Sequence, residues 1–165
     1  MGGRGQYGVV QGKEFSVGSH PAQSGPIVPV CAAIIVREGR VLVGRRREGR
    51  TDTGKWEFPG GKLLPGEDPR ECLVRELDEE FGVRAKVGGV CEVVNHTYGR
   101  YNVLLIFYRA DIPDGSLASR DHDMILWAGP EELSVIDFLD ADRPIAKRLI
   151  EELRNGVHGI SGGKE

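Results

Sequence analysis

Residues 61–83 read GKLLPGEDPRECLVRELDEEFGV, and this stretch predicts a glycine turn followed by a helix rich in carboxylates. Asp68 is a favourable N-cap residue, and Pro69 is tolerated in the first helical turn. Gly82 is typical of a helix end because glycine readily adopts the left-handed conformation. We therefore expect a helix over residues 69–81.

The predicted helix has two different faces. Its apolar residues are four positions apart, so they share a face that can pack into a core: Leu73, Leu77 and Phe81. Its glutamates follow an i, i+3, i+4 spacing and share another face: Glu76, Glu79 and Glu80. The helix is therefore expected to place one side against the core and to gather carboxylates on another.

Two interpretations of the carboxylates are open from these residues alone. The simpler one is a solvated acidic face. In the other, Glu67 lies just before the helix, and the glycines at the start of the stretch let the backbone turn back over the carboxylates. Carboxylates around one point suit a hard divalent cation, and Mg²⁺ favours a few carboxylates together with waters and substrate phosphates. Such an ion stabilises charge on a phosphate chain and activates a water.

The pattern G-x5-E-x7-R-E-U-x-E-E-x-G-U, where U is aliphatic, is that of the Nudix box. This stretch resembles it at all nine specified positions. The preceding residues 56–60, WEFPG, extend the resemblance to the MutT-like branch, which includes oxidised-dGTP diphosphatases and CTP pyrophosphohydrolases. The resemblance covers roughly residues 28–153. It implies an α/β fold, the Nudix α/β/α sandwich with a mixed β-sheet between helices.

Composition places the chain among ordinary globular proteins. It has 165 residues, 39% hydrophobic and 28% charged, enough for one domain with a core. The net charge of −3 gives no basic field for duplex nucleic acid, and no apolar run is long enough for a membrane span. No signal peptide is visible. Cys31, Cys72 and Cys91 lack metal-type spacing, so we expect buried free thiols and a cytoplasmic location.

The expected organisation is a tail, one domain and a second tail. Residues 1–25 are rich in Gly, Ser and Gln and predict a flexible tail. Their short apolar pieces leave open an edge strand or a contact with a second subunit, so monomer and homodimer are both open. A Nudix domain over 26–156 and a C-terminal tail over 157–165 follow. The expected strands are 27–36, 40–46, 56–58, 85–94, 101–109 and 124–127, with a turn at 95–101, a helical turn at 130–133 and a helix over 143–155.

The resemblance implies hydrolysis of a nucleoside triphosphate to a nucleoside monophosphate and pyrophosphate with Mg²⁺, or with Mn²⁺ as an alternative ion. It implies that Glu76, Glu79 and Glu80 are the catalytic metal ligands. It also implies a weaker, outer role for Glu67. The backbone carbonyl of Gly60 or of Gly61 would complete the coordination.

Two further residues have roles that the resemblance suggests. Arg75 lies four positions before Glu79, so it forms an ordinary helix ion pair and, in the functional interpretation, orients that metal ligand. Family members often carry a glutamate six residues before a tryptophan, and here Asp121 holds that position before Trp127. Asp121 is one methylene shorter. It is a ligand, a general base or a surface loop residue, and a glutamate of the box is the alternative base.

The substrate is expected to meet three basic residues. Arg45 and Arg46 end a strand near the box, and one of them is expected to point into the cleft as a countercharge for phosphate. Lys62 follows the glycines and either meets a phosphate or lies on the surface.

Asp142 precedes the last predicted helix, where MutT-like enzymes place a side chain that bonds the base. An ionised carboxylate only accepts hydrogen bonds, which favours guanine with its two adjacent donors. The alternative is a simple helix cap.

Two other functions compete with triphosphate hydrolysis. One is a Nudix hydrolase of another nucleoside diphosphate derivative, such as ADP-ribose or a dinucleotide. The other is a non-catalytic nucleotide sensor, which is less favoured because this chain keeps all the carboxylates of the box. Release of pyrophosphate with Mg²⁺, abolished by EDTA, separates an enzyme from a sensor.

Overall fold

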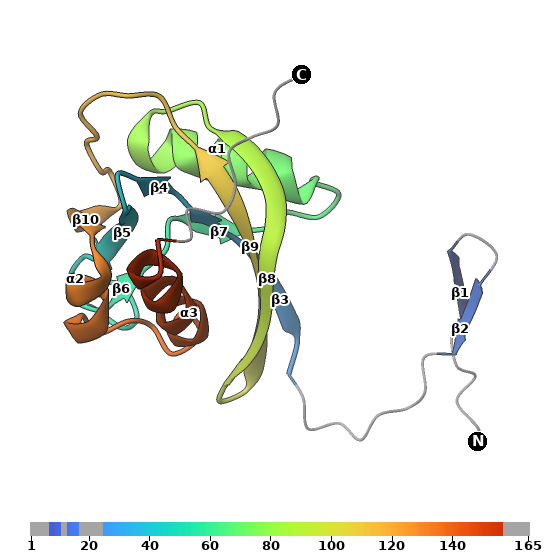
Figure 1. The fold of residues 1–165 in the computed structure, drawn as a ribbon. Coiled ribbons are helices and arrows are strands. Elements are labelled where there is room, and N and C mark those ends of the chain that lie inside the picture. Colours follow the sequence, from blue (N-terminus) through green and yellow to red (C-terminus); the bar gives the residue numbers. More distant parts are fainter. Residues whose placement is uncertain (1–6, 11–12, 17–24, 157–165) are drawn as a thin grey trace.

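The computed structural model describes residues 7–10, 13–16 and 25–156, and its main body contains two four-stranded sheets (Figure 1). The first has the order β7–β3–β9–β8: β3 (Ile27–Ile34), β7 (Gly60–Lys62), β8 (Lys86–Tyr98) and β9 (Tyr101–Asp111). The second has the order β10–β5–β4, with β6 also paired to β5: β4 (Val36–Arg37), β5 (Arg40–Arg46), β6 (Trp56–Glu57) and β10 (His122–Ala128). Because β3 and β9 are parallel while the other pairs are antiparallel, the first sheet is mixed.

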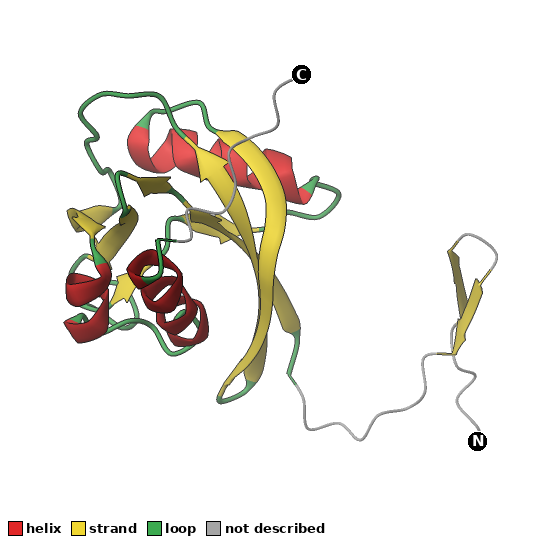
Figure 2. Cartoon of the chain, viewed as in Figure 1, coloured by secondary structure: helices red, strands yellow, loops and turns green. Residues whose placement is uncertain are grey.

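Helices cover both sides of the strands (Figure 2). They are α1 (Pro69–Phe81), α2 (Pro130–Val135) and α3 (Arg143–Arg154). In β3, Ala32 and Ile34 join the core cluster that contains α2 and α3, whereas Cys31 and Ala33 join the cluster that contains α1. This alternation follows from the two-residue period of a strand. The α/β/α sandwich expected from the sequence is therefore confirmed.

Helix α1 begins and ends where its sequence predicts. The Asp68 carboxylate accepts hydrogen bonds from the backbone N–H groups of Arg70 at 2.8 Å and of Glu71 at 3.4 Å. Gly82 closes the helix in the left-handed conformation, with φ of 68°. The buried residues of the apolar face are those expected: Leu73, Leu77 and Phe81.

Three elements differ from the sequence prediction. Strand β8 continues to Tyr98, where a turn was expected, because Tyr98 pairs with Tyr101 and their rings stack at 5.8 Å. The predicted strand 27–36 is two strands, because the chain passes from one sheet to the other at Ile35. Helix α2 is longer than the single turn expected. Strand β8 has a bulge at Gly88 and Gly89, where the register with β9 shifts between Val87 and Val90.

The N-terminal segment contains a hairpin of β1 (Tyr7–Val10) and β2 (Lys13–Ser16), which pair with each other and with no strand of the main sheets. The predicted tail at 157–165 lies outside the described residues. Cys31, Cys72 and Cys91 are free thiols as expected, the first two being buried. None of the helices in the described part of the chain has the length and apolarity to cross a membrane.

Candidate active site

A cleft of about 640 Å³ runs between the glycine turn, the C-terminal half of α1 and the loop before α3. It brings together six of the residues that the sequence singled out, from separate parts of the chain: Arg46, Lys62, Glu76, Glu80, Asp121 and Asp142. Gly60 and Gly61 lie in the same wall. Four others lie outside the lining: Arg45, Glu67, Arg75 and Glu79.

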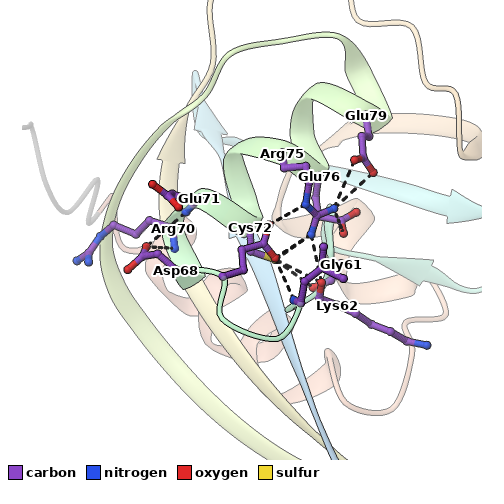
Figure 3. Close-up of polar contacts among 11 residues, drawn as sticks. Gly61, Lys62, Asp68, Arg70, Glu71, Cys72, Arg75, Glu76 and Glu79 are labelled. Atoms are coloured by element: carbon purple, nitrogen blue, oxygen red, sulfur yellow. Dashed lines mark hydrogen bonds and ion pairs between the residues drawn. The ribbon is translucent and has the colours of Figure 1, made fainter.

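Arg75 is the centre of an ion-pair network beside the cleft (Figure 3). Its Nε and Nη2 atoms donate to the two carboxylate oxygens of Glu67 at 2.7 and 3.0 Å. Its Nη1 donates to Glu76 at 2.7 Å and to both oxygens of Glu79 at 3.5 Å. The bonds to Arg75 hold the pKa of Glu67 at about 2, well below its usual range. Arg75 therefore holds three glutamates of the box with one guanidinium, which is a positioning role.

A glycine turn was expected at Gly61, but residues 60–62 form strand β7, which pairs with β3 and lies directly against Glu76. A Cβ atom placed on Gly61 would lie 2.2–2.4 Å from the Glu76 carboxylate, so only glycine allows this approach. The neighbouring Gly60 has φ of 145°, a conformation that favours glycine. The Glu76 side chain is 17% exposed and reaches the cleft between strand β7 and Arg75.

Glu80 is buried in the cleft wall, and its Oε2 atom has no hydrogen-bond partner among the described residues. Burial is the largest cause of a pKa of about 9 for Glu80; the charges of Glu57 and Glu76 also raise it, and a hydrogen bond with the Gly60 backbone lowers it. A buried carboxyl oxygen without a partner is costly to the fold and is a suitable ligand for a cation. The Glu80 carboxyl group therefore fits the binding of a divalent ion.

The carboxylates are not gathered into a finished metal site. Among the described residues, no three carboxylate, imidazole or thiol groups are close enough to form one. Glu79 is 58% exposed beside Arg75, whereas Glu80 is buried. Of the three glutamates predicted to share a face, Glu76 and Glu80 line the cleft and Glu79 lies outside it. The assignment of the metal ligands stays a prediction.

Asp121 lines the cleft and is paired with two arginines. Arg47 and Arg50 lie 3.7 and 3.4 Å from its carboxylate. The loop that carries Asp121 is tied to the end of α1, because the Arg120 N–H donates to the Glu80 carbonyl at 2.8 Å. Asp121 also contributes to raising the pKa of Glu80. These contacts place the Asp121 carboxylate near the box glutamates, while its role stays a prediction.

The two arginines at the end of β5 point to different sides, as alternation in a strand requires. Arg46 lines the cleft and donates to the Glu57 carboxylate at 2.5 Å. Arg45 instead makes a two-bond ion pair with Asp123 at 2.8 and 3.1 Å. The position of Arg45 gives no support to its predicted substrate contact, whereas Arg46 is available for the substrate.

Two cleft residues were missed by sequence reasoning. Glu57 bonds to Arg46 and lies 3.2 Å from the His122 ring, whose other nitrogen is 3.2 Å from the Ser119 hydroxyl. The only signal for Glu57 was its position between two buried aromatics, Trp56 and Phe58. No local pattern identifies His122 as a cleft residue, because its contact with Glu57 joins residues 65 positions apart, although its other partner, Ser119, is close in the sequence.

Asp142 holds the N-cap position of α3, as the helix-cap interpretation expects, but it is buried in the cleft wall and its side chain makes no capping hydrogen bond. Burial raises its pKa well above the usual range, Glu57 raises it further, and Arg46 lowers it. The sequence predicts an ionised Asp142 carboxylate, whereas the surroundings of this group favour the neutral acid. Next to it, Tyr98 and Leu139 provide an apolar wall.

The fold, the glycine turn and the carboxylate helix define a Nudix domain, and the profile of the NUDIX domain matches residues 26–153. The chain therefore belongs to the Nudix family. It is 36% identical over 126 residues to the CTP pyrophosphohydrolase of Escherichia coli, with 75% of this chain and 92% of that protein covered. It is 32% identical over 132 residues to the 8-oxo-dGTP diphosphatase of Haemophilus influenzae, with 79% and 97% covered.

Solved structures support the same placement. The MutT protein from Methanosarcina mazei Go1 superposes with a TM-score of 0.70 at 28% identity, covering 78% of this chain and 96% of that chain. The ORF135 protein of E. coli has a TM-score of 0.67 at 33% identity, with 82% and 96% covered. The chain is accordingly a Nudix hydrolase of the MutT type, and the expectation of a nucleotide pyrophosphohydrolase is confirmed at that level.

Proposed function

We propose that this enzyme hydrolyses a nucleoside triphosphate to a nucleoside monophosphate and pyrophosphate, with Mg²⁺ or in its place Mn²⁺. The candidate substrates are dGTP and CTP and their oxidised or modified forms. The observation that carries the proposal is the cleft, whose lining brings Asp142 together with Glu76 and with Glu80, which has an oxygen without a partner among the described residues. The names of the curated relatives, a CTP pyrophosphohydrolase and 8-oxo-dGTP diphosphatases, support the same substrate class.

The residues of the box would hold the metal. Glu76, Glu79 and Glu80, together with the Gly61 carbonyl, are its proposed ligands, and Glu67 acts further out through Arg75. The bound ion would neutralise charge on the phosphate chain and activate a water.

The remaining cleft residues act on the substrate and on the water. Arg46 and Lys62 supply positive charge for the phosphates. The proton of the attacking water goes to Asp121 or to a box glutamate, because these carboxylates lie at the same end of the cleft.

Asp142 is proposed to bond the base as a neutral acid. In that form it has one O–H donor and an acceptor oxygen, as an amide has. It can therefore pair with the amino group and ring nitrogen of cytosine, or with the ring N–H and oxygen of guanine. The preference for guanine rested on an ionised carboxylate, and the burial of Asp142 removes that basis.

A nucleotide panel tests the proposal. Purified enzyme is given dGTP, 8-oxo-dGTP, CTP, 5-methyl-CTP and ADP-ribose, with Mg²⁺ or with EDTA, and the products are separated. We expect pyrophosphate and a monophosphate from a triphosphate, and no turnover in EDTA. Turnover of ADP-ribose alone would contradict the triphosphate assignment, and nucleotide binding without products would identify a sensor.

Asp142→Asn and Asp142→Ala test the base contact. Asparagine keeps one donor and one acceptor, so we expect selectivity within the panel to be largely retained. Alanine leaves polar groups of the bound base unpaired, which costs about 1–3 kcal/mol on the preferred nucleotide and less on the others. The measurement is kcat/KM for each nucleotide. An equal loss on every nucleotide would remove Asp142 from base recognition.

A further inference from the structure

The tip of the β8–β9 hairpin is tied to the loop that carries Asp142. The Tyr98 hydroxyl accepts a hydrogen bond of 3.2 Å from the backbone N–H of Ala141, which lies 43 positions further along the chain. Tyr98, Ala141 and Asp142 all line the cleft. The hydroxyl therefore acts on the residue directly before Asp142.

This bond is distinctive among those that hold the loop. The other hydrogen bonds of the loop backbone join backbone groups: Leu139 N–H donates to the Trp56 carbonyl at 2.9 Å, and Asp142 N–H donates to the Leu139 carbonyl at 3.0 Å. The Asp140 side chain adds ion pairs with Lys55 at 3.9 Å and with Arg143 at 3.2 Å, but these do not involve the backbone. Among the described residues, Tyr98 is the one side chain that hydrogen-bonds the backbone of residues 139–142. Ala141 is 2% exposed, so without Tyr98 its N–H would be a buried donor without a partner.

The carboxyl group of Asp142 has no such support of its own. It makes no hydrogen bond or ion pair with any described residue, although only 3% of the residue is exposed. Its position in the cleft therefore depends on the backbone that carries it. A group that reads a base must be held closely in position, because a small displacement removes the gain from orientation.

Aromatic packing fixes the Tyr98 ring. It stacks on Tyr101 with 5.8 Å between ring centroids and meets the edge of His96 at 4.5 Å. Burial raises the pKa of Tyr98, so its hydroxyl stays protonated at neutral pH. The hairpin tip is thus a rigid support that presents one hydroxyl to the loop.

We propose that Tyr98 is a positioning residue for base selectivity, whose hydroxyl holds Ala141 and thereby sets the place of the Asp142 carboxyl group. The proposal rests on the proposed function and adds to it a residue that acts through Asp142. It predicts that removing one oxygen atom from the hairpin tip weakens the preference for one base over the others, while the box glutamates are unaffected.

The test compares Tyr98→Phe with Tyr108→Phe. Both changes remove one tyrosine hydroxyl, but Tyr108 packs in the core cluster on the α1 side of the sheet, away from the cleft lining. For each variant, kcat/KM is measured on the same nucleotide panel, and the melting temperature is recorded. We expect Tyr98→Phe to reduce the preference for the best nucleotide over the others by about fivefold, and Tyr108→Phe to change it by less than about twofold.

A second comparison separates positioning from stability. In an Asp142→Ala background, Tyr98→Phe should leave the preference unchanged, because the group that it positions is absent. An equal loss on all nucleotides, an unchanged preference, or the same shift without Asp142 would each overturn the proposal. Failure of the proposed function is distinguished beforehand, because the wild-type enzyme would then release no pyrophosphate from any nucleotide of the panel.

Discussion

At the scale of single residues, the carboxyl group of Glu80 shows most directly how structure prepares function. It is 5% exposed and has an oxygen without a partner among the described residues, so its pKa rises to about 9. These surroundings therefore favour a proton on Glu80 in the protein without metal. A cation would replace that proton, since metal ligands must be deprotonated.

Glu80 makes the stability of the metal-free protein depend on pH. Its folded-state pKa of about 9 lies above the usual 4.5, so its contribution is complete below 4.5 and is lost as the pH rises towards 9. Glu80→Gln stays neutral and should remove this dependence, whose slope is at most about 1.4 kcal/mol per pH unit. Denaturant unfolding of both proteins in EDTA across this range gives the comparison. Parallel curves would contradict it, because other titrating groups are common to both.

Glu79→Gln tests the metal-site assignment. The change keeps the size of the side chain and removes a charge that a hard cation favours. We expect turnover to fall by on the order of 10²-fold or more with the fold intact, as for loss of a dominant electrostatic group. Asp78→Asn is the matched control, because Asp78 is an exposed acidic neighbour on the same helix and lies outside the cleft. Near wild-type turnover of Glu79→Gln at saturating Mg²⁺ would reject Glu79 as a ligand.

At the scale of elements, the site depends on how closely β7 approaches α1. Gly61 in β7 lies against the Glu76 carboxylate, and the Lys62 carbonyl accepts a bond of 3.3 Å from Arg75. The strand and the helix are linked by residues 63–68, in which Asp68 starts the helix and Glu67 turns back to Arg75. The local geometry of residues 63–68 therefore helps to orient the carboxylates of Glu67 and Glu76.

Gly61→Ala should displace the Glu76 carboxylate without unfolding the protein. The added Cβ atom would meet the end of a flexible side chain, which can move, and the φ of Gly61 is one that alanine adopts. We expect turnover to fall by about tenfold or more, because the carboxylate loses its orientation. Gly89→Ala serves as control, since nothing lies within 4 Å of the Cβ position there. If both variants keep full turnover, the contact between Gly61 and Glu76 is not needed.

At the scale of the whole molecule, two sheets and two sets of helices bring distant residues to one cleft. The cleft is lined by residues of α1 and β7 and by residues of the β8–β9 hairpin and of the loop before α3. Both core clusters involve β3, β5 and β9, so these central strands connect the two groups of lining residues. The N-terminal hairpin takes no part in these sheets.

Removal of the residues before Gly25 should leave folding and turnover per site unchanged. Pairing of the main sheet begins at Ile27, and β1 and β2 pair only with each other. Gly25 is retained because a Cβ atom there would overlap the Arg100 carbonyl, which shows close packing. Melting temperature, kcat and molecular mass in solution are compared with those of the full chain. Aggregation, or loss of activity together with loss of a dimer, would show that the segment is structural.

The sequence by itself determined the parts of this protein that depend on neighbouring residues. The limits of α1, its N-cap at Asp68 and its end at Gly82 follow from local backbone preferences and were predicted correctly. The nine positions of the Nudix box predicted the family, and through it the sandwich and the class of reaction. The resemblance also predicted that one of Arg45 and Arg46 would face the cleft, and Arg46 lines it.

Only the tertiary structure decided which oxygen atoms lack partners and which residues meet across the cleft. The contact of Glu57 with His122 and that of Tyr98 with Ala141 join segments 65 and 43 positions apart, and no local pattern encodes either. The burial of Asp142 likewise raises the pKa of a carboxyl expected to be ionised, which favours the neutral acid. The reason is that the free energy of a charge depends on the solvent and charges around it, and folding sets those surroundings.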